Sequence, residues 1–171
     1  AGVEATPGKG TDVPLYILGS SLFGAKLAAA LGLPYAFASH FAPQALRQAV
    51  ATYRHEFQPS EQQAEPYVIA GVNVIASDTE QDAQAQLTTV RRARVRMFVQ
   101  RGATVTDEQA DEILASPQGA QIAEMMRYSA VGTADQVQAA LDAFAVHADA
   151  DELMVVAASP GIELKTAPEG Y

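Results

Sequence analysis

The chain has 171 residues, of which 49% are hydrophobic, and its 11 Lys plus Arg against 20 Asp plus Glu give a formal net charge of -9. Such a chain can bury the core of one ordinary domain, and its negative charge disfavours nucleic acid and anionic membranes as partners. Because it lacks cysteine, disulfides and zinc–thiolate sites are excluded, and because no apolar run approaches the length of a membrane span, we expect a soluble, cytoplasmic protein.

The chain opens on a Gly- and Pro-rich stretch, residues 1–12, which reads as a linker before the folded unit. The apolar run Leu15–Leu18 then predicts a buried strand. The alanine-rich stretch Ser21–Leu31 predicts a helix, and Gly32 is suited to end it as a C-cap residue.

A second strand and helix follow in the same order. Tyr35–Ser39 predicts the strand, and Pro43 fits the first turn of a helix that continues to about Phe57 and stops before Pro59. Tyr67–Ala76, which is long and rich in Val and Ile, predicts the third strand.

Three segments have the pattern of a helix capping box, with Ser or Thr at the cap and Glu or Gln three residues later: Ser77–Glu80, Thr106–Gln109 and Thr133–Gln136. They predict helices that run towards Gln100, to about Ala115 and through Ala145. A further helix over Gln118–Tyr128 precedes the third box, and Glu152–Ala157 predicts the fourth strand.

Four strands separated by helices indicate a parallel sheet of the α/β class, because parallel neighbours need a long crossover connection. The pattern alone leaves open whether the sheet is doubly wound or part of a barrel. Residues 158–171 contain Pro and Gly without helical periodicity. We therefore expect residues 13–157 to form the folded domain, residues 158–171 to form an irregular tail, and the last strand to lack a covering helix.

The turn Gly19-Ser20-Ser21, between the first strand and its helix, is the strongest candidate for a binding site. Backbone N–H groups at a helix N-terminus, with two hydroxyls beside them, favour an anion such as a phosphate. The turn matches neither a Walker A loop nor a GxGxxG fingerprint. The alternative interpretation is that it only caps the helix.

A second candidate segment, Ser39-His40-Phe41, follows the next strand. Ligands of parallel α/β sheets and barrels bind at the carboxyl ends of the strands. At that position His40 is suited to donate to a flavin or to act as an acid or base, and Phe41 is suited to pack on a ring. The alternative is that His40 only forms hydrogen bonds within its loop.

The remaining candidates have ordinary explanations. His55 and His147 suit structural positions on helices, and because no two histidines have metal-ligand spacing, we expect no metal site. Met125 and Met126 fit a core or an interface, and Tyr128 is a distant third candidate for the site. The basic cluster is predicted to lie on a solvated helix, and its members are Arg91, Arg92, Arg94, Arg96 and Arg101.

Four segments taken together resemble one enzyme family, and they are Pro14–Ser21, Ala28–Phe41, Arg127–Thr133 and Ala150–Val156. They are similar to motifs of the bacterial luciferase-like flavin monooxygenases, in particular the alkanal-monooxygenase-like subgroup. The resemblance extends from Val13 to Ala157. It implies the C-terminal half of a TIM (β/α)8 barrel, with the visible strands as the fifth to the eighth.

The resemblance also implies an activity: a flavin-dependent oxidoreductase that uses reduced FMN and dioxygen on a small organic substrate such as an aldehyde. In that family the turn matching Gly19-Ser20-Ser21 helps to hold the flavin phosphate. The segment matching Ser39-His40-Phe41 lies by the isoalloxazine ring. The substrate, the electron donor and the choice between FMN and the deazaflavin F420 stay open.

The family's N-terminal half, with its first four strands and its usual catalytic histidine, has no counterpart in this sequence, so no catalytic base is assigned. A half barrel has two exposed sheet edges, and unpaired strand edges favour association. We therefore expect a homodimer or pairing with the N-terminal half of the barrel. Two alternatives are a non-catalytic flavin-binding or interaction protein that kept this scaffold, and a flavodoxin-like sheet with a phosphate loop.

Overall fold

The computed structural model describes residues 6–99 and 105–157 of the chain. The strands are β1 (Ile17–Gly19), β2 (Tyr35–Phe37), β3 (Val68–Ala76), β4 (Ser129–Gly132) and β5 (Glu152–Ala157). The helices are α1 (Leu22–Leu31), the 3-10 turn η1 (Pro43–Ala45), α2 (Leu46–Glu56), α3 (Glu80–Val99), α4 (Asp107–Leu114), α5 (Pro117–Met125) and α6 (Ala134–Ala148). The predicted tail, Arg101 and the first five residues of the predicted linker lie outside the described residues.

The sheet contains the four predicted strands, and all of its strand pairs are parallel. β2 pairs with Val68–Ala70 of β3, whereas β5 pairs with Ile69–Val74. Because Ile69 and Ala70 pair with both strands, β2 and β5 lie on opposite edges of β3. The spatial order β1, β2, β3, β5 therefore follows the chain order of the four predicted strands, as in a barrel, and confirms the parallel α/β prediction.

β4 is a fifth strand that the sequence did not predict. The helix expected over Gln118–Tyr128 ends at Met125, and the chain then forms β4 beside Asn73–Ala76 of β3. Since Asn73 and Val74 also pair with β5, β4 occupies the same edge of β3 as β2. β4 forms because β2 stops at Phe37 and leaves that edge open.

The registers leave a gap between β2 and β4 along that edge. β2 reaches Ala70 and β4 begins at Asn73, so Gly71 and Val72 have no partner strand there among the described residues. The chain leaving β2 turns aside at this point as the segment Ser39-His40-Phe41. The gap therefore lies beside one of the two predicted site segments.

The helix ends follow local sequence signals with one exception. Ser21 caps α1, Gly32 ends it in the left-handed region at φ 62°, and Thr106 with Gln109 forms a complete capping box. The prediction of a box at Ser77–Glu80 was wrong, because Thr79 caps α3 by accepting from the Asp82 amide at 3.1 Å. None of the helices in the described residues combines the length and the hydropathy of a membrane span.

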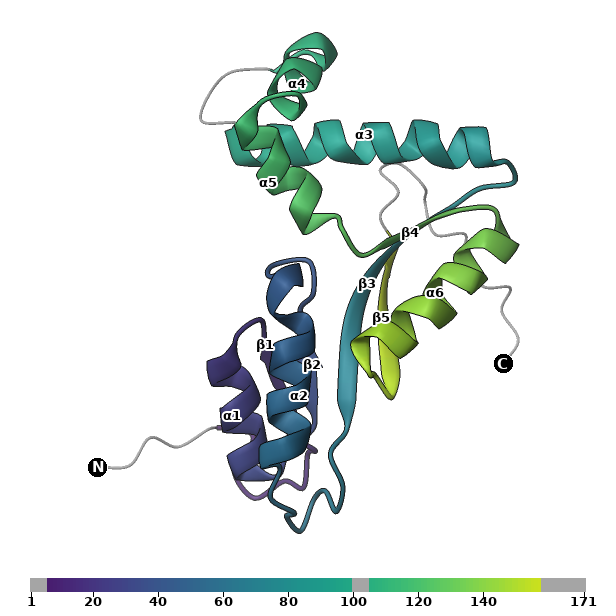
Figure 1. Cartoon of the computed structure of the whole chain (residues 1–171). Coiled ribbons are helices and arrows are strands. Elements are labelled where there is room, and N and C mark those ends of the chain that lie inside the picture. Colours follow the sequence, from purple (N-terminus) through teal and green to yellow (C-terminus); the bar gives the residue numbers. More distant parts are fainter. Residues whose placement is uncertain (1–5, 100–104, 158–171) are drawn as a thin grey trace.

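One face of the sheet, which we call the covered face, is packed by α1, α2 and α6 (Figure 1). Its buried side chains include Tyr35, Phe37 and Val68, and the helices contribute Leu46, Val50, Tyr53 and Phe144 to the same core. Burial of this apolar surface is the main driving force for the fold. The core thus lies on the outer side of the expected barrel wall.

The other face, which we call the inner face, carries the alternate residues of the same strands. Paired residues on neighbouring strands point to the same side, so Leu18 shares this face with Ile69, Gly71, Asn73 and Met154. Leu18 is 67% exposed and Met154 is 47% exposed. The inner face is therefore open along its edge strands β1 and β5, whereas Ala36 and Ile69 between them are buried.

α3 crosses the sheet at its carboxyl end, with α4 and α5 packed around it (Figure 1). Ile75 and Val131, on the inner face at that end, contact Leu87 and Val90 of α3. A second small core joins Val95 of α3 to α4 and α5 through Val105, Ala110 and Ile122. The three helices thus form a separate layer over the carboxyl end of the strands, where the predicted site lies.

Candidate functional site

The turn Gly19-Ser20-Ser21 leads from the carboxyl end of β1 into the N-terminus of α1, as predicted. The Ser21 hydroxyl accepts from the Gly24 amide at 3.4 Å, and the Ser21 carbonyl accepts from the buried Tyr35 hydroxyl at 3.0 Å. A Cβ placed on Gly19 would lie 3.5 Å from the Gly24 Cα. The two hydrogen bonds of Ser21 thus hold the turn at the start of the helix.

The same turn keeps hydrogen-bonding capacity for an anion. The first turn of any helix has more N–H groups than one cap can satisfy, and the helix dipole favours negative charge there. The Ser20 hydroxyl is half-buried and forms no hydrogen bond with the described residues. Ser21 therefore serves as the helix cap, while Ser20 and the remaining first-turn amides are the groups that a phosphate could engage.

The second predicted segment lies directly beside this turn. The Ala38 amide donates to the Gly19 carbonyl at 2.8 Å, which joins the carboxyl ends of β1 and β2. Ser39 is fully buried, and its hydroxyl donates to the Phe37 carbonyl at 3.4 Å. The structure thus brings the two predicted segments together, with the Ser39 hydroxyl turned towards its own backbone.

His40 lies over Gly71 at the gap between β2 and β4. A Cβ on Gly71 would lie 3.6 Å from the His40 Nδ1, so a methyl group would just fit against the imidazole, and a larger side chain would meet it. The ring of Phe41 packs against the imidazole with centroids 4.5 Å apart, and Phe41 itself is largely exposed. His40 therefore lies on the inner face, over the gap between β2 and β4.

Two polar residues near His40 have roles that the sequence reasoning did not predict: Asn73 was not considered, and Arg94 was assigned to a solvated helix. Asn73 is 2% exposed on the inner face, its side-chain amide donates to the Tyr128 carbonyl at 3.4 Å, and Arg94 of α3 donates to its Oδ1 at 3.5 Å. The signal for Asn73 was a lone amide within a Val- and Ile-rich strand. Arg94 had no distinguishing signal, because its contact depends on how α3 crosses the sheet.

The environment of His40 favours its neutral form. Burial lowers the pKa of the His40 imidazole, and the positive charge of Arg94 lowers it further. Near neutral pH the imidazole is thus uncharged, with one nitrogen able to donate and the other able to accept a hydrogen bond. We call His40, Asn73 and Arg94 the His40 cluster. Arg94 supplies its positive charge.

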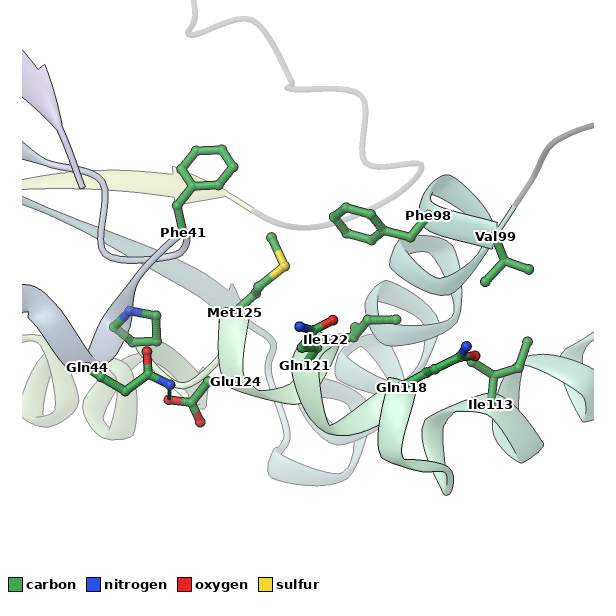
Figure 2. A pocket seen from close by; sticks show the side chains of 11 residues that line it. Phe41, Gln44, Phe98, Val99, Ile113, Gln118, Gln121, Ile122, Glu124 and Met125 are labelled. Carbon is green, nitrogen blue, oxygen red and sulfur yellow. Dashed lines mark hydrogen bonds between the residues drawn. The ribbon is translucent and has the colours of Figure 1, made fainter. Parts of the chain in front are cut away.

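A cavity of about 730 Å³ opens beside Phe41 (Figure 2). Its apolar wall consists of Phe41, Pro43, Phe98, Val99, Ile113, Ile122 and Met125. Its polar groups are Gln44, Gln118, Gln121 and Glu124, and the Gln44 side chain donates to Glu124 at 2.8 Å. This volume lies within the range of about 300–1,000 Å³ that is usual for small-molecule sites.

Comparison with known proteins identifies the family of this chain. The sequence profile described as "Luciferase-like monooxygenase" matches residues 1–152. The chain belongs to this family. Among the curated relatives of the luciferase-like chain, the luciferase-like monooxygenase of Escherichia coli (strain K12) is 38% identical over 157 residues, which are 90% of this chain and 46% of that protein.

Solved structures agree with this assignment. The crystal structure of apo-MsnO8 is 33% identical in sequence, has a TM-score of 0.71, and the match covers 90% of this chain and 48% of that chain. The coenzyme F420 dependent tetrahydromethanopterin reductase from Methanopyrus kandleri is 17% identical with a TM-score of 0.53, over 87% of this chain and 46% of that one, and shares the fold. The chain thus spans about half the length of these relatives, and its sheet is half of the TIM barrel of the luciferase-like family, as predicted.

The other residues considered from the sequence have structural roles in this luciferase-like half barrel. The Tyr128 side chain packs on Phe144 of α6, and its hydroxyl lies 3.1 Å from the His147 Nε2, on the side of the covered face. Tyr128 therefore reaches the His40 cluster only through its backbone carbonyl. Among the described residues, no three His, Asp or Glu side chains lie together in a way that could hold a metal ion.

Three members of the basic cluster have partners that the prediction of a solvated helix did not include. Arg92 pairs with Asp107 at 2.9 Å and with Asp111 at 2.5 Å, and Arg96 pairs with Asp107 as well. These pairs join α3 to α4, whereas Arg94 reaches the sheet. Arg91 is exposed as expected.

Proposed function

We propose that this chain forms half of the active site of a flavin-dependent monooxygenase, which uses reduced FMN and dioxygen on a small organic substrate such as an aldehyde. Family membership supports the reaction class. The observation that carries the proposal is the hydrogen bond from the Ala38 amide to the Gly19 carbonyl. It sets a helix N-terminus suited to a phosphate beside a histidine suited to a flavin ring.

The phosphate would bind at the turn Gly19-Ser20-Ser21. A phosphate dianion is stabilised by the positive end of the α1 dipole, by the free amides of the first turn and by the Ser20 hydroxyl. Ser21 contributes indirectly, because its hydroxyl caps the helix and holds the turn in place. This arrangement favours FMN over a flavin without phosphate.

The isoalloxazine ring would lie by the segment Ser39-His40-Phe41. When bound, the flavin supplies the redox chemistry and the activation of dioxygen, and the protein orients it and shields it from water. The neutral imidazole of His40 can donate or accept a hydrogen bond at the ring, and Phe41 offers an apolar surface. Arg94 places a positive charge where it would stabilise negative charge on a bound ligand.

Coenzyme F420 is the alternative cofactor. The Methanopyrus kandleri reductase, which shares this fold, is described as F420 dependent. Both cofactors carry a phosphate ester, so the turn at Ser20 is compatible with either one. Titration of the protein with each cofactor under the same conditions distinguishes them.

The test compares FMN with riboflavin, which has the same ring without the phosphate. We expect the fluorescence of both flavins to be quenched on binding, with a lower Kd for FMN than for riboflavin. Ser20→Ala should raise the Kd of FMN about tenfold, because one hydrogen bond to a charged group is lost. The Kd of riboflavin should not change. Thr88→Ala, which removes an exposed hydroxyl on α3, is the matched control. Equal affinities for the two flavins, in wild type and variant, would rule out the phosphate site.

The open inner face supports a partner that completes the barrel, either a second copy or the N-terminal half of the barrel. Leu18, Met154 and Val156 are exposed apolar side chains on that face, and β1 and β5 form its two edges. Exposed apolar strands of this kind favour association. Flavin binding without oxygen consumption in the completed assembly would favour the non-catalytic alternative.

A further inference from the structure

The cavity beside Phe41 is built from four separate parts of the chain, one of which is Ile113 of α4. The segment after β2 contributes Phe41, the end of α3 contributes Phe98, and α5 contributes Met125, whose side chain points between the two rings (Figure 2). Gln118 lies at the far end from Phe41 in the same view. Because the Phe41 ring also packs on His40, the cavity opens next to the His40 cluster.

The charge of the cavity wall limits what it can bind. Among the described residues that line it, none is Lys, Arg or His. Its one acidic member, Glu124, is already engaged by Arg127 at 2.7 Å and by Gln44 at 2.8 Å. A charged ligand would lose hydration here without gaining an opposite charge, which is unfavourable.

The polar groups that remain available are the side-chain amides of α5. Gln118 and Gln121 are both exposed, and both line the cavity. An amide offers a donor and an acceptor, so it can satisfy a hydroxyl, carbonyl or amine of an uncharged molecule. The wall is thus apolar along the α3 and α5 helices and carries neutral hydrogen-bonding groups on α5.

We propose that this cavity is the substrate site, and that it selects neutral, mostly apolar molecules with one hydrogen-bonding group held by Gln118 or Gln121, against anionic ones. The substrate role rests on the function proposed above, since it assumes that flavin chemistry takes place at the adjacent His40 cluster. The charge selectivity rests only on the residues of the cavity. It is therefore measurable without flavin.

The experiment titrates the flavin-free 171-residue chain with two fluorescent probes that share one ring system. N-phenyl-1-naphthylamine is neutral, and 1-anilinonaphthalene-8-sulfonate adds a sulfonate to it. We expect the neutral probe to bind at least about tenfold more tightly, because burying the unpaired sulfonate is costly. Failure of the neutral probe to bind, or equal affinity for both probes, overturns the proposal.

A pair of variants locates the selectivity in the cavity. Gln121→Lys adds a cation to the wall, and we expect it to strengthen binding of the sulfonate probe about tenfold. Ala123→Lys adds the same charge to the same helix, but about 200° around the helix axis from Gln121 and away from the cavity wall. It should leave the ratio of the two probe Kd values unchanged. If both variants shift the ratio equally, or neither does, the probes bind elsewhere and the proposal is wrong.

These measurements separate the two proposals. A chain that shows the expected probe selectivity but does not bind FMN keeps the neutral-ligand cavity and loses the flavin assignment. A chain that binds FMN through Ser20 but shows no probe selectivity keeps the flavin site and loses this cavity as the place of the substrate.

Discussion

Gly71 is the residue on which the position of His40 depends most directly. Its missing side chain leaves room for the imidazole on the inner face, where the nearest atoms to a placed Cβ are the Phe37 carbonyl at 3.5 Å and the His40 Nδ1 at 3.6 Å. These are ordinary contact distances, so one methyl group fits. A larger side chain would have to displace the ring.

This geometry predicts a size threshold at position 71. Gly71→Ala should retain flavin affinity, whereas Gly71→Val should displace His40, weaken both FMN and riboflavin, and cost about 1–3 kcal/mol of stability through overpacking. Flavin titration and thermal denaturation of the two variants measure these effects. Unchanged flavin affinity in Gly71→Val would show that His40 does not line the flavin ring.

Arg94 provides a second prediction at the residue scale. Burial and the Arg94 charge both lower the pKa of His40 below its ordinary value of 6.5, so an NMR titration of the imidazole should have its midpoint below that value. Arg94→Gln should raise the midpoint, since a repulsive charge is removed. Arg91→Gln, at an exposed position three residues away on α3, is the control and should leave it unchanged.

The same shift has a consequence for stability. Because the folded-state pKa of His40 is lower than the unfolded one, the unfolded chain binds more protons as the pH falls through 6.5 towards the folded value. The His40 contribution thus destabilises the fold progressively in that window and is absent above it. Denaturant unfolding at successive pH values should show that the free energy of unfolding falls less in Arg94→Gln than in wild type as the pH is lowered.

At the scale of elements, α3, α4 and α5 form a unit distinct from the rest of the fold. Their core of Val95, Val105, Ala110 and Ile122 is separate from the larger core beneath the covered face. The ion pairs of Arg92 and Arg96 with the acidic residues of α4 add contacts within the unit. This layer supplies one wall of the cavity and holds Arg94 over the sheet.

A local change in this unit should therefore have a local effect. Thr106 caps α4 by accepting from the Gln109 amide at 3.3 Å, and Thr106→Ala should destabilise that helix by about 1 kcal/mol. We expect faster amide hydrogen exchange in α4 with little change in α1, α2 and α6. Thr88→Ala on α3 is the control, and a uniform acceleration over all helices would contradict the separation of the two cores.

At the scale of the whole molecule, the sheet is covered on one side and partly open on the other. Leu18, Met154 and Val156 on the inner face are 67%, 47% and 40% exposed. In a closed barrel these positions would point into a filled interior. Their exposure is the physical reason to expect association of this chain with a complementary half.

Association through this face predicts a specific sensitivity. Met154→Lys places a charge where a partner would bury an apolar side chain, so it should weaken association at least about tenfold. Val146→Lys is the matched control, because Val146 is 84% exposed on α6, away from the sheet's inner face. Sedimentation equilibrium measures both, and equal effects of the two variants would place the interface elsewhere.

Much of the fold was predictable because its signals are local. The strands β1, β2, β3 and β5 are apolar runs between helices, and the caps at Ser21, Gly32 and Thr106 depend on residues within a few positions of one another. The short strand β4 was not predictable. Its four residues carry little periodicity. They form a strand only because β2 ends early and leaves the carboxyl-terminal part of the same edge of β3 unpaired.

The sequence by itself determined the parallel α/β sheet and the family, since both depend on the order and spacing of residues along the chain. It also determined that Ser20 and His40 follow strands and thus lie at one end of the sheet. Only the tertiary structure decided that Arg94 reaches Asn73 and lowers the pKa of His40 through its charge, and that Phe41, Phe98 and Met125 line one cavity. Those contacts join residues far apart in the chain, and they depend on the angle at which α3 crosses the strands, which local pattern does not encode.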